Sequence, residues 1–133
     1  MSPAGPFTLG KEERICSRTL IDKLFNGDES RSLSSFPLRV VYMLTERKEQ
    51  DVPAKLLVSV SKKHFKHAVK RNRVKRQIRE TYRLNKHLVV ASMEQKKDLQ
   101  LALAFVWLAD KLYSTAIVEQ HVRILLKRIS DKL

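Results

Sequence analysis

Residues 55–86 read KLLVSVSKKHFKHAVKRNRVKRQIRETYRLNK, and this stretch decides the fold. Its first part, residues 55–61, alternates in side-chain character as a half-buried β-strand does. From about residue 67 to residue 87 the chain has no Gly or Pro and is rich in good helix formers. The stretch therefore predicts a strand that leads, after a short turn, into a long helix.

The predicted helix has two unlike sides when its residues are placed 100° apart. One side suits a protein core and is formed by Val74, Ile78, Thr81, Tyr82 and Asn85. The opposite side is polar and cationic, and it carries Asn72, Arg76, Arg79 and Arg83. We therefore expect one side to pack on a sheet while the other faces solvent or a binding partner.

The rest of the chain supplies elements before and after this unit. Before it we expect a short amphipathic helix at 11–25, a turn-rich loop at 26–35, a strand at 38–44 and a charged connection at 46–53. After it we expect a strand at 99–109, which is apolar at almost every position, and a last helix from Ser114 or Thr115. The order helix-strand-strand-helix-strand-helix predicts an α+β fold. Residues 1–10 are expected to form an irregular arm, and residues 11–133 a single α/β domain.

Most of the positive charge lies in the predicted helix and the turn before it. The chain carries 27 Lys and Arg against 14 Asp and Glu, a net charge of +13. Residues 62–86 alone hold eleven basic residues and one acid, Glu80. A solvated helix face is the plainest explanation of a charge run, but such a face normally contains acids for i,i+4 ion pairs. The near-absence of acids favours a surface that binds a polyanion.

Composition argues against several other classes of protein. The longest uncharged apolar stretch, residues 99–109, is too short to span a membrane, which takes about 20 residues. The N-terminus lacks the pattern of a secretory signal. A single cysteine, Cys16, excludes an intramolecular disulfide framework and indicates a reducing compartment. We therefore expect a cytoplasmic protein without a membrane partner.

One string within the basic window resembles a known family. The strand ends in S-V-S-K-K at residues 59–63, and the helix opens with A-V-K-R-N-R-V-K-R-Q-I-R at residues 68–79. This pattern resembles the signature of the bacterial ribonuclease P protein component, and the order of elements around it resembles that family too. Two departures are present, because Lys66 stands where members commonly have Gly and the first helix offers one aromatic instead of two.

The resemblance implies a function in which the protein is not itself the catalyst. In that family the protein is the small subunit of a ribonucleoprotein endonuclease, and the RNA subunit removes the 5′ leader of precursor tRNA with Mg²⁺. The implied partners are this catalytic RNA and precursor tRNA, with no protein partner required. The implied fold is a small α/β sandwich of the ribosomal S5 domain 2-like type. No catalytic residue and no metal site are expected in the protein.

Arginine suits such a role because its planar, permanently charged fork matches phosphate oxygens in pairs. Asn72 is predicted either to contact RNA or to make a local structural hydrogen bond, and Arg71 is predicted to be partly structural because it lies nearer the sheet side of the helix. The expected RNA-binding residues are Lys62, Lys63, Lys70, Arg71, Asn72, Arg73, Lys75, Arg76, Arg79 and Arg83.

The resemblance also implies a cleft for the single-stranded leader, lined by the first helix. The best matching pair is Ile21 and Phe25, with Leu20 in another register, and Tyr42 of the first predicted strand is expected to share the stacking of bases. Phe25 as an ordinary core residue is an equally good interpretation.

Two other functions stay open at this point. A non-catalytic structural RNA-binding protein, of ribosomal or RNA-chaperone type, would show the same basic helix. A ribonuclease that cuts RNA with its own histidines is a weaker possibility, since His64 and His67 lie in a dense basic field that disfavours a protonated imidazole.

Overall fold

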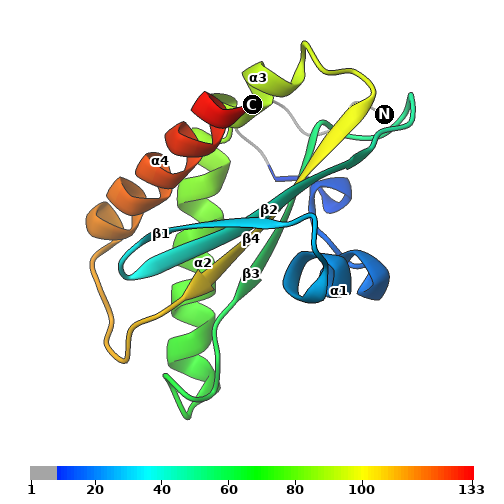
Figure 1. Ribbon diagram of the computed structural model, residues 1–133. Helices are drawn as coiled ribbons and strands as arrows, with labels where there is room; N and C mark the ends of the chain where they lie inside the picture. The colour runs from blue at the N-terminus through cyan, green and yellow to red at the C-terminus, as the bar shows by residue number, and fades with distance from the viewer. Residues whose placement is uncertain (1–8) are drawn as a thin grey trace.

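The computed structural model describes residues 9–133, so residues 1–8 of the predicted arm lie outside the described residues (Figure 1). The elements are η1 (Lys11–Glu13, a 3-10 turn), α1 (Arg18–Asn26), β1 (Arg31–Ser35), β2 (Leu38–Glu46), β3 (Ala54–Ser59), α2 (Ala68–Asn85), α3 (His87–Met93), β4 (Leu99–Trp107) and α4 (Thr115–Lys132).

Four strands form one mixed sheet in the order β1-β2-β4-β3. Strand β2 is antiparallel to both β1 and β4, whereas β3 runs parallel to β4. Parallel neighbours need a crossover connection, which here consists of α2 and α3. Strand β4 has neighbours on both sides, which explains why nearly every residue in it is apolar. The predicted α+β class is confirmed, and the apolar strand predicted at 99–109 lies inside the sheet as β4.

The two faces of the sheet bury different residues because successive side chains of a strand point to opposite sides. Helices α2, α3 and α4 cover one face, and α1 lies against the other (Figure 1). The larger core, on the first face, includes Leu38, Val40, Tyr42, Leu101, Leu103, Phe105 and Trp107. The smaller core, under α1, consists of Ile15, Leu24, Val41, Met43, Ala102 and Ala104.

The first helix is shorter than the sequence predicts. It begins at Arg18 instead of residue 11, and the Ser17 hydroxyl caps it by accepting a hydrogen bond from the Leu20 amide at 3.3 Å. Residues 11–13 form only the 3-10 turn η1. Between the two, the Ile15 amide donates to the Leu56 carbonyl at 2.9 Å, which attaches this segment to the edge of β3.

The expected loop at 26–35 is wrong in its second half, because residues 31–35 form β1. This edge strand is rich in serine, and Leu33 is its one apolar residue, so it lacks the hydrophobic alternation on which the prediction depended. It is held by pairing with β2 and by α4, whose His121 Nδ1 lies 2.7 Å from the Ser35 hydroxyl.

The predicted long helix is α2, which ends at Asn85, and a short helix that was not predicted, α3, begins at His87. Between them lies Lys86, which is 5% exposed. Its Nζ donates to Glu13 Oε1 at 2.6 Å, and Glu13 is 7% exposed. This buried ion pair, together with the Ile15–Leu56 hydrogen bond, holds residues 10–15 beside α2. We call residues 10–15 the N-terminal segment.

Candidate nucleic-acid interface

Helix α2 is fixed in its rotation by apolar packing and by polar bonds to α4 and to the segment just before it. Val74, Ile78 and Tyr82 are fully buried in the larger core. Gln77 Nε2 donates to the Tyr113 carbonyl at 3.0 Å and to the Thr115 hydroxyl at 3.1 Å. The predicted inward side of the helix is therefore confirmed, and the opposite side is presented to the surface.

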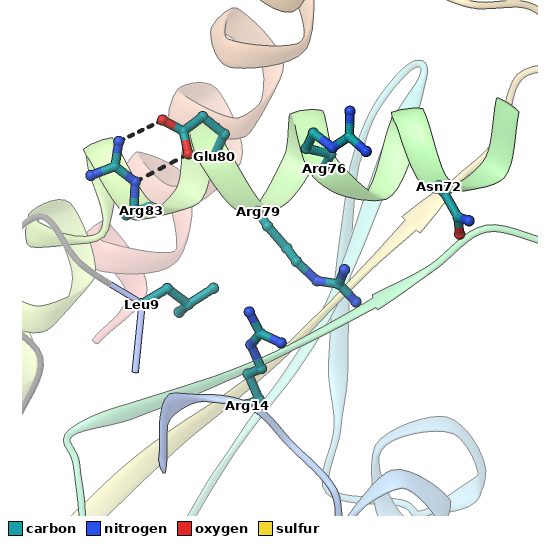
Figure 2. A pocket seen from close by; sticks show the side chains of 7 residues that line it. All are labelled: Leu9, Arg14, Asn72, Arg76, Arg79, Glu80 and Arg83. Atoms are coloured by element: carbon teal, nitrogen blue, oxygen red, sulfur yellow. Dashed lines mark hydrogen bonds and ion pairs between the residues drawn. The ribbon is translucent and has the colours of Figure 1, made fainter. Parts of the chain in front are cut away.

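The exposed side of α2 lines a cavity of about 470 Å³, shown in Figure 2. The other wall is the N-terminal segment with the residue before it. We call this space the arginine cavity, and it is lined by Leu9, Arg14, Asn72, Arg76, Arg79, Glu80 and Arg83. All four residues predicted for the polar side of the helix therefore lie in one concave site.

Arg14 and Arg79 point their guanidinium groups toward each other across the arginine cavity (Figure 2). Partial burial, and then the charge of Arg14, lowers the pKa of Arg79 below its ordinary value. Within residues 9–133 neither guanidinium has a hydrogen bond or an ion pair. Two facing cations without a carboxylate between them form a site that an anion would stabilise.

Glu80, the single acid of the basic window, interacts with Arg83 on the next turn of α2. Arg83 Nε donates to Glu80 Oε2 at 3.1 Å, and this hydrogen bond lowers the pKa of the Glu80 carboxyl. The Glu80 carboxylate thus offsets the positive charge of Arg83 at the end of the cavity nearest the C-terminus of α2. Arg14, Arg76 and Arg79 make the remainder of the site strongly positive.

Arg71 has a structural role in the turn before α2. Its Nη1 donates to the carbonyls of Phe65 and Lys66, each at 2.9 Å, and its side chain is half-buried. These bonds hold the turn that joins β3 to α2, in which Phe65 is buried. The predicted partly structural role of Arg71 is confirmed by this geometry.

We expect Arg71→Ala to lower the free energy of unfolding by about 1–3 kcal/mol, because it removes two hydrogen bonds from a charged donor to carbonyls near the surface. Arg73→Ala is the matched control, since Arg73 is exposed on the same helix, and it should change stability by about 0.5 kcal/mol or less. Urea unfolding of both variants measures the difference. Equal stability of the two variants would contradict the structural role.

The other predicted RNA-binding residues do not line the cavity. Lys62, Lys63, Lys70 and Arg73 are exposed and Lys75 is half-buried. Lys62 and Lys63 belong to the turn before α2, where the Lys63 amide donates to the Ser61 hydroxyl at 3.0 Å. The cationic surface therefore extends from the arginine cavity around the N-terminal end of α2.

The structure separates the three residues predicted for the leader cleft. Ile21 and Phe25 belong to α1, where Ile21 packs on the smaller core and Phe25 is 41% exposed. Tyr42 is 5% exposed and lies in the larger core on the opposite face of the sheet. The prediction that Tyr42 shares a cleft with Phe25 is wrong, because Tyr42 follows the alternation of Leu38 and Val40 on β2.

Arg14 is the member of the site that the sequence analysis missed. It reaches the cavity only because the Ile15–Leu56 hydrogen bond and the Glu13–Lys86 ion pair place the N-terminal segment beside α2. No spacing rule connects residue 14 with residue 79. The sequence offers only a weak signal for Arg14, which is the apolar Ile15 next to it.

Residues 9–133 contain no cluster of three or more His, Cys, Asp or Glu side chains placed to bind a metal ion. His64 Nδ1 lies 2.6 Å from Asp110 Oδ1, so it links the turn before α2 to the segment after β4. In the same part of the chain no helix is both long and apolar enough to cross a bilayer.

Fold and site together define the class as small basic α+β proteins that present an arginine-lined helix on a mixed sheet. The family model described as Ribonuclease P matches residues 9–130. The ribonuclease P protein component of Porphyromonas gingivalis is 40% identical over 133 residues, which are all of this chain and 94% of that protein. The one from Chlorobaculum tepidum is 31% identical over 128 residues, or 91% of this chain and 82% of that protein.

The solved ribonuclease P protein from Thermotoga maritima has a similar fold. It superposes with a TM-score of 0.65 at 23% sequence identity, over 87% of this chain and 96% of that one. The chain therefore belongs to the family of ribonuclease P protein components, and the resemblance stated from the sequence is confirmed.

Proposed function

We propose that the chain binds the catalytic RNA of ribonuclease P and the 5′ leader of precursor tRNA, and that it thereby promotes Mg²⁺-dependent removal of the leader. The observation that carries this proposal is the arginine cavity, in which Arg14 and Arg79 face each other without a carboxylate between them. A phosphate oxygen placed between two guanidinium groups accepts hydrogen bonds from both and relieves their repulsion.

The protein contributes charge neutralisation and positioning to this reaction. Two polyanions, the catalytic RNA and the precursor, must approach each other, and a net charge of +13 between them reduces their repulsion. The described residues offer no metal-ligand cluster. In this proposal Mg²⁺ belongs to the RNA and its substrate, and no step of the hydrolysis uses a protein side chain.

Reconstitution tests the proposal. Purified protein is mixed with precursor tRNA and Mg²⁺, with and without the cognate catalytic RNA. We expect cleavage at the leader junction only when that RNA is present, and faster cleavage at low Mg²⁺ when the protein is added. Cleavage by the protein alone would overturn the proposal in favour of a protein ribonuclease. If the protein bound RNA but did not change cleavage, a structural RNA-binding role would replace it.

Arg14→Ala should weaken binding to the catalytic RNA about tenfold, because the arginine cavity loses one of its two facing guanidinium groups. The slope of log affinity against log salt should become shallower by about one unit. Arg18→Ala, which removes an exposed charge from α1, is the control. Filter binding over a salt series measures both variants, and identical slopes for Arg14→Ala and the wild type would remove Arg14 from the interface.

A further inference from the structure

The loop after β4 lies beside the turn before α2. We call residues 60–67, which join β3 to α2, the basic turn, and residues 108–114, which join β4 to α4, the β4–α4 loop. Because β3 and β4 are parallel, both connections leave the same end of the sheet (Figure 1). His64 Nδ1 of the basic turn lies 2.6 Å from Asp110 Oδ1 of the β4–α4 loop, and the His64 side chain is only 16% exposed. This bond joins two segments that are 46 residues apart in the sequence.

Further hydrogen bonds hold the β4–α4 loop in a defined conformation. At its start, the Leu108 amide donates to the Pro37 carbonyl at 2.9 Å. Near its end, Gln77 Nε2 of α2 donates to the Tyr113 carbonyl at 3.0 Å. The loop is therefore attached to the turn between β1 and β2 and to α2, so its exposed side chains extend from a fixed backbone.

Lys111 is the cation of the β4–α4 loop, and an aromatic ring supports it. The Lys111 Nζ lies 5.1 Å from the centroid of the Tyr113 ring, within the range of a cation–π interaction. The Tyr113 ring packs in a T-shaped arrangement on the buried Trp107, with the two centroids 5.8 Å apart. A lysine supported in this way loses less conformational freedom when it binds an anion than an unsupported one does.

The basic turn and the β4–α4 loop together form one cationic surface. Their only acid is Asp110, which is hydrogen-bonded to His64. Their lysines are all exposed, and they are Lys62, Lys63, Lys66 and Lys111. This surface continues the one that extends from the arginine cavity around the N-terminal end of α2, so we assign both to the same partner.

The chemistry of this surface suits a partner that presents phosphates and not bases. Among the described residues, no large hydrophobic side chain of the basic turn or the β4–α4 loop is exposed, so the surface lacks the apolar centre of a protein or membrane contact. The Tyr113 ring is already engaged by Lys111 and Trp107, whereas single strands are held by rings that are free to stack on bases. Paired regions of a folded RNA present their backbone instead.

We propose that the β4–α4 loop is a second element of the interface with the catalytic RNA, in which Lys111 binds a backbone phosphate beside those bound by Lys62 and Lys63. His64 is a positioning residue in this arrangement, because its bond to Asp110 holds the loop beside the basic turn. The inference rests on the proposed function and extends it to the connection that leads into α4. The RNA-binding residues predicted from the sequence all belong to the basic turn and α2.

The first test is binding of the catalytic RNA by Lys111→Ala over a salt series. We expect affinity about three- to fivefold weaker at physiological salt, the order expected for one exposed ion pair. The slope of log affinity against log salt should become shallower by about one unit. Lys48→Ala is the matched control, because Lys48 is exposed in the connection between β2 and β3, at the opposite end of the sheet. This control should keep the wild-type slope, and thermal unfolding confirms that both variants are folded.

A second test separates positioning from a contribution to stability alone. His64→Ala should weaken RNA binding about as much as Lys111→Ala, and the double variant should bind no more weakly than either single variant, because Lys111 has then already lost its place beside the basic turn. Asp110→Asn keeps an oxygen that accepts from His64, so it should bind at least as well as the wild type. If the losses of the two single variants multiply in the double variant, the positioning role of His64 is overturned.

Footprinting identifies the RNA that Lys111 contacts. The reconstituted holoenzyme with precursor tRNA is treated with hydroxyl radicals. Lys111→Ala should lose protection at one paired region of the catalytic RNA, at a site different from the one that Arg14→Ala loses. Loss of protection on the precursor tRNA instead, or in an unpaired segment, would overturn the assignment to the paired backbone of the catalytic RNA.

Failure of this inference is distinct from failure of the proposed function. If Arg14→Ala weakens binding of the catalytic RNA while Lys111→Ala behaves as Lys48→Ala does, the inference is overturned and the proposed function stands. If the wild type neither binds the catalytic RNA nor promotes cleavage, the proposed function fails, and the inference fails with it.

Discussion

Replacing Arg76 and Arg79 together by alanine should weaken binding to the catalytic RNA by about 10²- to 10⁴-fold at physiological salt. Both side chains line the arginine cavity on the exposed side of α2. A hydrogen bond to a charged group is worth about 1.5–3 kcal/mol, and each 1.4 kcal/mol is tenfold in affinity. Two lost phosphate contacts therefore account for the expected range.

The affinity of each variant for the catalytic RNA is measured over a series of salt concentrations. This series separates the effect of local phosphate contacts from the effect of the protein's net charge. Loss of two phosphate contacts should make the salt slope shallower by about two units. The control variant, Lys127→Ala with Lys132→Ala, removes the same charge from exposed positions on α4. If both double variants lose affinity equally, net charge and not the arginine cavity governs binding.

The arginine variant should also fold as well as the wild type. Arg79 is destabilised as a cation by partial burial and by the facing Arg14, so its removal relieves repulsion in the free protein. Thermal unfolding without RNA is the check. A marked loss of stability would show that the two arginines support the fold, and the affinity loss would then need another explanation.

Elements with a strong, uninterrupted pattern were predictable from the sequence. The helix at 68–85 has no Gly or Pro, and its inward positions repeat at helical spacing, so both its extent and its buried side follow from residues 67–87. Strand β4 is recognisable because a central strand must be apolar on both faces. Strand β1 is not recognisable from the sequence, because its serines are typical of a turn and its pairing with β2 is a tertiary interaction.

The cavity-lining residues that the sequence predicted all lie on one helix, α2. The arginine that it missed, Arg14, is brought to the cavity by long-range contacts. Arg76 and Arg79 follow from periodicity within α2. Arg14 joins them only through the packing of the N-terminal segment on β3 and at the α2–α3 junction. Tyr42 was misplaced for a related reason, because β2 is apolar at Val40, Val41, Tyr42 and Met43 alike, so alternation in the sequence does not tell which face each residue takes.

Glu13→Ala should lower the free energy of unfolding by about 3–5 kcal/mol, the usual cost of leaving one member of a buried ion pair without the other. Glu13 Oε1 accepts from Lys86 Nζ at 2.6 Å, and Glu13 Oε2 accepts from the Gly10 amide at 2.7 Å. Both side chains are nearly inaccessible to solvent. Removal of the carboxylate therefore leaves a buried ammonium without its counter-ion and frees the start of η1.

Equilibrium unfolding in urea measures this effect, and a double variant controls for it. Glu13→Met with Lys86→Met replaces the ion pair by apolar side chains of similar length, which is often neutral or stabilising at buried positions. We expect the double variant to regain most of the stability lost by Glu13→Ala. If the double variant is as unstable as Glu13→Ala, the charge of the pair is not the cause, and the hydrogen bond to Gly10 becomes the better explanation.

The same two variants separate the stability of the ion pair from its effect on the RNA site. Arg14 adjoins Glu13 and faces Arg79 only while the N-terminal segment stays docked on α2 and β3. In buffer where both variants are folded, Glu13→Ala should bind the catalytic RNA about as weakly as Arg14→Ala does. The double Met variant should bind it almost as well as the wild type, because apolar packing keeps the segment in place. Weak binding by a stable double variant would mean that the carboxylate itself, and not docking of the segment, orients Arg14 toward the RNA.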